Sequence, residues 1–196
     1  MAVETIAPPQ LTHEAGDRYQ FTVHDYHRMA EAGILDEKQR VELIEGDIVW
    51  MAPLGGTHVE SVMVANRPFV HAVGDHAFVS IQSSVRLNDL SEPQPDMAIV
   101  RKRRYGGKLP TPEDVFLIVE IADTSLRFDR DRKVALYAAS DIPEVWIVDV
   151  NAGVLLRFAE PIDGQYRIAD RHERGATLML SALPSATIAV SDFFPE

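Results

Sequence analysis

Two acidic residues lie on two short apolar segments in the middle of the chain. Asp96 opens the segment DMAIV, and Glu120 interrupts the apolar segment FLIVEIA. A carboxylate inside an otherwise apolar strand needs a partner, because burying an unpaired charge is costly. Mg²⁺ and Mn²⁺ prefer oxygen ligands, commonly one or two carboxylates together with water and substrate phosphate. If the two segments are neighbouring strands, they predict a metal site with Asp96 and Glu120 as ligands.

A lysine follows these acids on the basic segment DRDRKVALYAAS, which we expect to belong to a helix at about residues 126–139. Lys133 borders an apolar face of this helix, next to Tyr137, so its stem can be buried while the ammonium group reaches a strand end. There it would position or deprotonate the attacking water, or neutralise charge on a phosphoryl group. Taken alone, Lys133 is an exposed helix residue that pairs with Asp129 four positions earlier. Only the combination with the two acids predicts a hydrolytic site.

Three further polar residues could support this site, and each has a structural alternative. Glu42, in VELIEGDIV, could add a carboxylate that holds water on the metal, or it could be an ordinary hairpin residue. Gln82, on the strand before Asp96, could face the same cleft or make a surface hydrogen bond. His58 could contact substrate or cap the helix that it opens.

The loop RKRRYGG carries the densest group of positive charges in the chain. Its cations could grip phosphates while the tyrosine stacks on a base, and otherwise they form a solvated loop. Together with the basic helix, we expect this loop to flank the site. The candidate substrate-binding residues are Arg101, Lys102, Arg103, Arg104 and Tyr105.

Patterns near the N-terminus predict two helices and a hairpin. Thr22, with Asp25 three positions later, predicts the start of a helix that ends at Gly33. The segment VELIEGDIVWMAP predicts a hairpin in which Gly46 supplies the positive φ of the turn. Residues 58–73 predict a second helix, although Pro68 could interrupt it. The expected core positions of this helix are Val59, Val62, Met63, Phe69 and Val70.

Apolar runs predict the strands that carry the acids and their neighbours. Residues 78–87 alternate in part, and residues 96–100 and 116–122 are the two acidic strands. The strand EVWIVD, at 144–149, follows the expected basic helix, and this order favours parallel pairing with the 116–122 strand. The tail supplies two or three further strands, in VLLRFAE, YRIADRH and ATLML.

Composition predicts one globular domain. The chain has 196 residues, of which 46% are hydrophobic and 25% charged, so we expect an N-terminal arm at 1–19 and a single domain at 20–196. Lys and Arg number 19 against 30 Asp and Glu, and the resulting net charge of −11 counts against a non-specific nucleic-acid binder. The chain has no cysteine, its first residues MAVETIAPPQ lack a basic segment followed by an apolar run, and no window approaches the roughly 18 apolar residues of a membrane span. We therefore expect a cytoplasmic protein without a membrane segment, whose metal ligands are oxygen or imidazole.

The order of these motifs resembles the Uma-two family of restriction endonucleases, within the PD-(D/E)xK nuclease superfamily. The resemblance rests on Pro95-Asp96, on Glu120 in VEI, and on the segments DRDRKVALY and IPEVWIVD, and it extends from VELIEGDIVWMAP to IAVSDFF. It implies an α/β (α+β) fold of the restriction-endonuclease-like type, a mixed β-sheet flanked by helices. It also implies Mg²⁺ or Mn²⁺ as cofactor, with Asp96 and Glu120 as first and second metal ligands.

The chain departs from the superfamily motif at the lysine. That lysine normally lies two residues after the second acid, where this chain has Ala122. The resemblance implies that the lysine has moved to the following helix as Lys133, with Tyr137 beside it.

The leading hypothesis is a metal-dependent endonuclease that hydrolyses DNA phosphodiester bonds. A two-fold homodimer would suit double-strand cleavage. Because the lysine is displaced and the chain is acidic, one alternative is a binding or scaffold protein with weak or no catalysis. Another alternative is a metal-dependent hydrolase of a substrate other than DNA.

Overall fold

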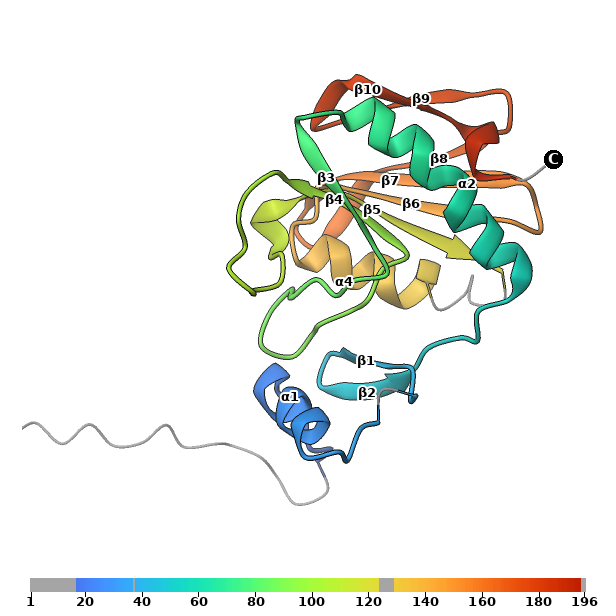
Figure 1. Ribbon diagram of the computed structural model, residues 1–196. Coiled ribbons are helices and arrows are strands. Elements are labelled where there is room, and N and C mark those ends of the chain that lie inside the picture. The colour runs from blue at the N-terminus through green and yellow to red at the C-terminus, as the bar shows by residue number, and fades with distance from the viewer. Residues whose placement is uncertain (1–16, 37, 124–128, 195–196) are drawn as a thin grey trace, which may run out of the picture.

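The computed structural model describes residues 17–36, 38–123 and 129–194 (Figure 1). Residues 1–16 of the expected arm and residues 126–128 of the expected basic helix lie outside these ranges. A six-stranded sheet forms the centre, in the order β3-β4-β5-β6-β7-β8. Its strands are β3 (Ala77–Ile81), β4 (Met97–Arg101), β5 (Val115–Ala122), β6 (Glu144–Asp149), β7 (Val154–Ile162) and β8 (Gln165–Glu173).

The sheet is mixed, as the fold class predicts. Strands β5 and β6 pair in parallel, with Val119 opposite Trp146, and the other neighbours pair antiparallel. The expected parallel pairing is therefore confirmed. It places the ends of β5 and β6 at the same edge, beside the chain that enters the basic helix.

Alternation along β5 divides its side chains between two cores. Leu117, Val119 and Ile121 face one layer, and Ile118 and Ala122 face the other. Both faces of β5 are covered, which explains why its sequence is apolar almost throughout. Glu120 shares the face of Ile118 and Ala122 and is only 3% exposed.

One face of the sheet is covered by α2 (Gly56–Val73), by the hairpin of β9 (Thr177–Leu180) and β10 (Leu183–Ala189), and by the 3₁₀ turn η3 (Val190–Phe193). Figure 1 shows α2 and this hairpin above the sheet. Phe69, Trp146 and Phe193 form an aromatic cluster there, with ring centroids 5.7–6.3 Å apart. The buried ring of Trp146 therefore joins helix, sheet and C-terminal turn.

The core face of α2 lies on a different side of the helix from the one its sequence predicts. Val62 and Phe69 are buried as expected, but Val59, Met63 and Val70 are exposed. The helix lies on one side of the sheet only, so the buried stripe follows the helical period and includes the small residues Ser61 and Ala65. Pro68 lies inside the helix without ending it.

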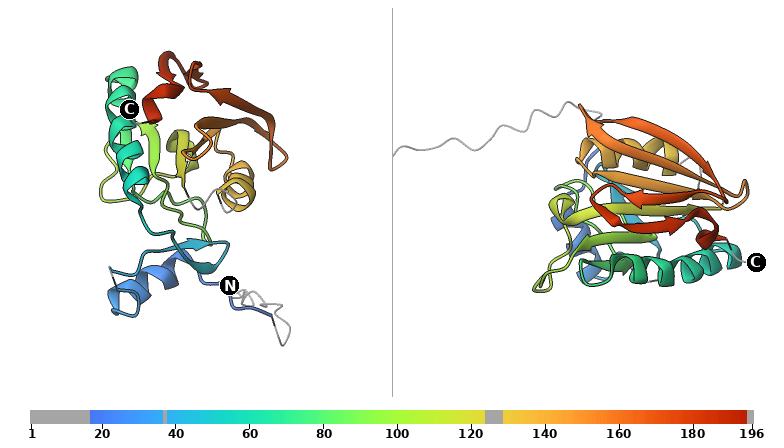
Figure 2. Two further views of the ribbon diagram at one scale, coloured as in Figure 1. Left: turned by 90° about the vertical axis from the view of Figure 1, so that its right-hand side faces the viewer. Right: turned by 90° about the horizontal axis from the view of Figure 1, so that it is seen from above.

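The opposite face carries the basic helix and an N-terminal hairpin. A π-helical turn, η2 (Asp129–Lys133), continues into α4 (Val134–Ala139), and the hairpin consists of β1 (Val41–Ile44) and β2 (Asp47–Trp50). In the left view of Figure 2, α2 and α4 lie on opposite sides of the sheet, and the hairpin lies below with α1 (Val23–Glu31). The predicted capping box of α1 is present, because Thr22 and Asp25 bond to each other's backbone. Among the described helices, none combines the length and apolar character that crossing a membrane requires.

Two strand predictions need correction. The strand expected at 78–87 ends at Ile81, because Gln82 has a φ of +44° that breaks the extended backbone. The tail forms four strands, whereas two or three were predicted; the strand that was not predicted is β10. A short 3₁₀ turn, η1 (Pro112–Asp114), lies between β4 and β5.

The Gly46 turn gives a stability prediction. Gly46 has φ +81°, and a Cβ atom there would lie 2.5 Å from Cβ of Gln20. We expect Gly46→Ala to lower the free energy of unfolding by about 2 kcal/mol or more, since backbone strain and a steric clash add. Gly33→Ala is the matched control, because Gly33 has φ +70° but nothing within 4 Å of its Cβ position. Urea unfolding would contradict this account if Gly46→Ala were no more destabilising than Gly33→Ala.

Candidate active site

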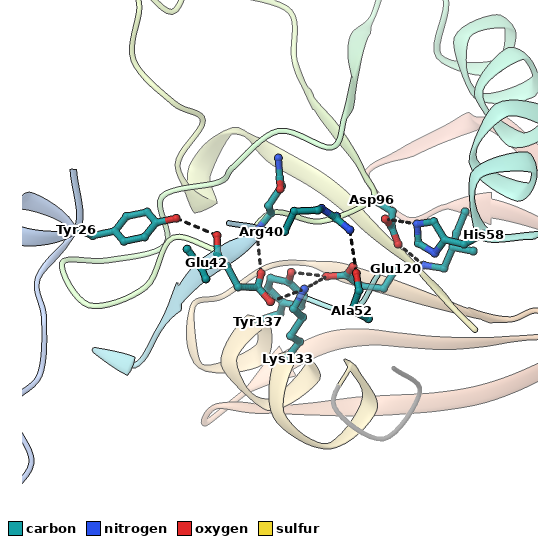
Figure 3. Close-up of polar contacts among 12 residues, drawn as sticks. Tyr26, Arg40, Glu42, Ala52, His58, Asp96, Glu120, Lys133 and Tyr137 are labelled. Carbon is teal, nitrogen blue, oxygen red and sulfur yellow. Dashed lines mark hydrogen bonds and ion pairs between the residues drawn. The ribbon is translucent and has the colours of Figure 1, made fainter. Parts of the chain in front are cut away.

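Asp96 and Glu120 lie side by side at one edge of the sheet. Met97 pairs with Val119 across β4 and β5, and the same register continued by one residue brings Asp96 opposite Glu120. Asp96 Oδ2 accepts a hydrogen bond of 2.8 Å from the backbone N–H of Ile121. The two acidic strands are thus neighbours, as the sequence predicts, and Figure 3 shows both carboxylates directed towards the same space.

Lys133 reaches this space from the helix side. Its Nζ lies 3.3 Å from Oε1 of Glu120 and 3.2 Å from Oε1 of Glu42. The hydroxyl of Tyr137, one turn further along, donates a 2.7 Å hydrogen bond to Oε1 of Glu120. Lys133 is 4% exposed, so it is not a solvated helix residue. Its positive charge offsets two buried carboxylates that would otherwise repel each other.

Contacts between Arg132 and the N-terminal hairpin hold the helical turn that carries Lys133 against the site. Arg132 lies 3.1 Å from Oδ2 of Asp47 and 3.4 Å from Oε2 of Glu45, and it donates to the backbone oxygen of Ile44. The hairpin is therefore tied to the π-helical turn, a feature that often marks functional sites in helices. The alternative pairing of Lys133 with Asp129 involves a side chain outside the described part of the chain.

Glu42 is held on the inner face of the hairpin. It is 2% exposed, and its Oε2 accepts a 3.1 Å hydrogen bond from the backbone N–H of Gln94. One carboxylate oxygen thus faces Lys133 while the other is bound by the segment that leads to Asp96. The structure brings Glu42 to the acids.

His58 lies in the first turn of α2, beside Asp96. Its Nε2 is 2.9 Å from Oδ1 of Asp96, a charge contact without the alignment of a good hydrogen bond. The Asp96 carboxylate raises the pKa of His58, and burial and the positive charge of Arg40 oppose this shift. His58 therefore contacts the Asp96 carboxylate, and it does not cap its helix, whose N-cap is Gly55.

These side chains line one cavity of about 420 Å³, which includes solvent at its mouth. The sequence reading missed two of its polar members, Arg40 and Gln94. For Gln82 the sequence left two alternatives, facing the cleft or making a surface hydrogen bond, and its side chain does not line the cavity. Its backbone oxygen instead accepts a 2.5 Å hydrogen bond from the amide of Gln94. The lining residues are Arg40, Glu42, Trp50, Met51, Ala52, Leu54, His58, Gln94, Asp96, Glu120 and Lys133.

The basic loop lies at the other end of β4, which corrects the expectation that it flanks the site. Asp96 precedes β4 and Arg101 ends it, a separation of roughly 16 Å for an extended strand. Lys102 is paired with Asp75, and Arg103 lies 2.7 Å from Asp114. No residue of this loop lines the cavity within the described ranges.

The loop's other side chains also serve its own structure. The guanidinium of Arg101 covers the ring of Phe116, that of Arg103 stacks on Tyr105, and Arg104 is exposed. The Tyr105 hydroxyl donates to the backbone oxygen of Arg101. Contacts of this loop with substrate remain a prediction.

The carboxylates that could hold a divalent cation are those of Asp96 and Glu120. Across residues 17–36, 38–123 and 129–194, no three His, Asp or Glu side chains are placed to hold a metal ion together. Mg²⁺ typically needs only one or two carboxylates and keeps several water ligands. The donor set therefore fits a cation that shares its coordination with water and substrate.

Comparisons with known proteins show the fold and the family of this chain. The crystal structure of a "putative nuclease belonging to DUF820" from Anabaena variabilis ATCC 29413 superposes with a TM-score of 0.71 at 13% identity, over 89% of this chain and 97% of that chain. This likeness shows a shared fold. No curated protein matches the sequence. The family model Uma2, described as "Putative restriction endonuclease", matches residues 23–191. The chain therefore belongs to the Uma2 family.

Proposed function

We propose that this chain is a metal-dependent nuclease that hydrolyses phosphodiester bonds of DNA, with Mg²⁺ or Mn²⁺ held by Asp96 and Glu120. The observation that supports this proposal is the meeting of these two acids with Lys133 in one cavity. Side chains from two strands and a helix meet in this cavity, and several of them are buried charges. Burying charges is costly and does not by itself stabilise the fold, so such a group of buried charges indicates a functional site. The family description supports nuclease activity, and DNA is the substrate class that a restriction endonuclease implies.

The side chains have separable roles in this proposal. When bound, the divalent ion supplies positive charge that acidifies water and stabilises the leaving oxygen. Lys133, as an ammonium held between Glu42 and Glu120, orients the attacking water or offsets charge on the phosphoryl group, and Tyr137 keeps Glu120 in place through its hydrogen bond. Glu42 holds the ammonium of Lys133 from the other side and can accept a hydrogen bond from water. His58 orients Asp96.

The proposal predicts strict dependence on a divalent cation. We expect the wild-type protein to cleave plasmid DNA with Mg²⁺ or Mn²⁺ and to lose this activity when EDTA removes the ion, because the ion acidifies the attacking water and stabilises the leaving oxygen. Gel electrophoresis of supercoiled plasmid measures both nicking and linearisation. Cleavage that continues unchanged in excess EDTA would contradict the metal-dependent mechanism.

A second candidate is metal-dependent hydrolysis of a different phosphodiester. It is favoured by the net charge of −11 and by the distance of the basic loop from the cavity, since both weaken attraction to duplex DNA. A panel of duplex DNA, single-stranded DNA, RNA and bis(p-nitrophenyl) phosphate separates the two candidates. The preferred substrate should show the highest kcat/KM and the same loss in EDTA. Sedimentation of the protein with and without DNA tests the predicted homodimer.

A further inference from the structure

We propose that Arg40 is the phosphate-binding residue of this cavity and holds a phosphodiester group of the substrate beside Asp96 and Glu120. The inference rests on the proposed function and adds to it a residue that neither the motif nor the family description assigns. It also identifies the source of positive charge that the distant basic loop does not provide.

Hairpin geometry directs Arg40 into the site. The backbone N–H of Met51 donates to the Arg40 oxygen at 2.9 Å, which extends the pairing of β1 and β2 by one residue. Since side chains alternate along a strand, Arg40 shares the inner face with Glu42, which contacts Lys133. Figure 3 shows the Arg40 side chain in the same group as Glu120 and Asp96.

Arg40 differs from the other basic residues of the cavity, because those residues contact carboxylates and Arg40 contacts a neutral backbone oxygen. Lys133 lies against Glu42 and Glu120, and His58 lies against Asp96. Arg40 instead donates from Nη1 to the backbone oxygen of Ala52 at 2.8 Å, a neutral partner. No carboxylate of the described residues forms an ion pair with Arg40.

The hydrogen bond from Arg40 to Ala52 orients the guanidinium group so that it can bind an anion. One N–H fixes the direction of the planar group, and the others remain available in a fork that matches two oxygens of a phosphate. Arg40 is half-buried at the cavity wall, where an ionic hydrogen bond is less screened than at an open surface. The substrate phosphate would supply the negative partner that Arg40 lacks.

The test combines binding and cleavage by Arg40→Ala and Arg40→Lys. Arg167→Ala is the matched control, because it removes an exposed arginine on β8 that pairs with Glu160 and does not line the cavity. A fluorescein-labelled oligodeoxynucleotide is titrated in Ca²⁺ at several NaCl concentrations, and cleavage is measured in Mg²⁺ or Mn²⁺. Thermal unfolding of each variant detects any effect of losing the contact with Ala52.

We expect Arg40→Ala to reduce the slope of log K against log salt by about 0.9, the contribution of one phosphate contact. We also expect kcat/KM to fall by about 100-fold. Arg40→Lys should keep the salt slope and show an intermediate loss of kcat/KM, because it retains the charge without the fork. Arg167→Ala should cleave like the wild type.

The outcomes separate this inference from the proposed function. If the wild type cleaves DNA and Arg40→Ala has an unchanged salt slope and rate, Arg40 does not bind phosphate although the nuclease proposal stands. If Arg40→Ala only lowers the melting temperature, its role is to hold Ala52 and the inference is wrong. If the wild type binds DNA without cleaving it and the slope still depends on Arg40, the inference stands and the nuclease proposal fails. A wild type that neither binds nor cleaves DNA overturns both.

Discussion

Replacing Glu120 by glutamine is expected to abolish DNA cleavage while the protein stays folded. The amide keeps the size of the side chain and can still accept the hydrogen bond from Tyr137, but it removes a negative metal ligand. We expect kcat to fall by at least about 1,000-fold, equivalent to about 4 kcal/mol of lost transition-state stabilisation. Single-turnover cleavage of plasmid or oligonucleotide measures this loss directly.

A matched variant separates loss of the ligand from loss of negative charge in general. Asp75→Asn removes an acid whose side chain is 97% exposed and which pairs with Lys102. It should cleave at the wild-type rate. Thermal unfolding should show that Glu120→Gln remains folded. Cleavage by Glu120→Gln within a few-fold of wild type would exclude Glu120 from the proposed chemistry.

Replacing Lys133 by methionine is expected to impair both stability and activity. Methionine fills similar space, but Glu42 and Glu120 then remain buried without their shared cation. Breaking a buried charge network in this way costs about 3–5 kcal/mol. The rate of cleavage should also fall by about 100-fold or more, because the group that orients water or offsets phosphoryl charge is lost. Chemical denaturation and single-turnover cleavage measure the two effects.

A second substitution separates these two roles. In Lys133→Met with Glu42→Gln, one of the two carboxylates that share the Lys133 ammonium is neutralised, so part of the lost stability should return while the cleavage defect persists. Lys108→Met, at an exposed position in the loop before β5, is the control and should change neither quantity. If the double variant regained wild-type cleavage, Lys133 would be a structural residue only.

Local sequence patterns predicted that the two acids would lie on neighbouring strands, and the strand pairing confirms this. Glu120 interrupts an apolar strand, and strand alternation places it on one face with Ala122. Asp96 starts the neighbouring strand, so an antiparallel register brings the carboxylates together. The displaced lysine was predicted on Lys133 from the family resemblance, and the structure places its ammonium group beside Glu120.

The buried face of α2 and the strand β10 were harder to predict, because both depend on tertiary contacts that the local sequence does not contain. Met63 was one of the five predicted core positions of α2, but it is 70% exposed because only one side of the helix meets the sheet. Strand β10, with the sequence LPSATIA, has few large apolar residues and a proline, so its pairing with β9 follows from tertiary contact rather than from propensity.

The direction of the strand that follows Asp96 predicts where the basic loop lies, and the sequence-based prediction did not use this direction. A strand that starts at Asp96 must deliver the following basic loop to its opposite end, so this loop could have been excluded from the edge of the site. Period-two alternation could likewise have placed Arg40 beside Glu42, two residues along the same hairpin strand. Gln94 carried a weaker signal, because its role depends on its backbone N–H, which sequence patterns do not report.

The most direct test of the central claim is calorimetric titration of Mn²⁺ into the wild type, Asp96→Asn and Glu120→Gln. The account predicts divalent-metal binding by the wild type and a loss of that binding in both variants, because each removes one charged oxygen ligand from the same site. Asp75→Asn should bind as the wild type does. Two results would contradict the assignment of Asp96 and Glu120 as the metal ligands. One is that the wild type does not bind Mn²⁺, and the other is that both site variants bind Mn²⁺ as tightly as the wild type does.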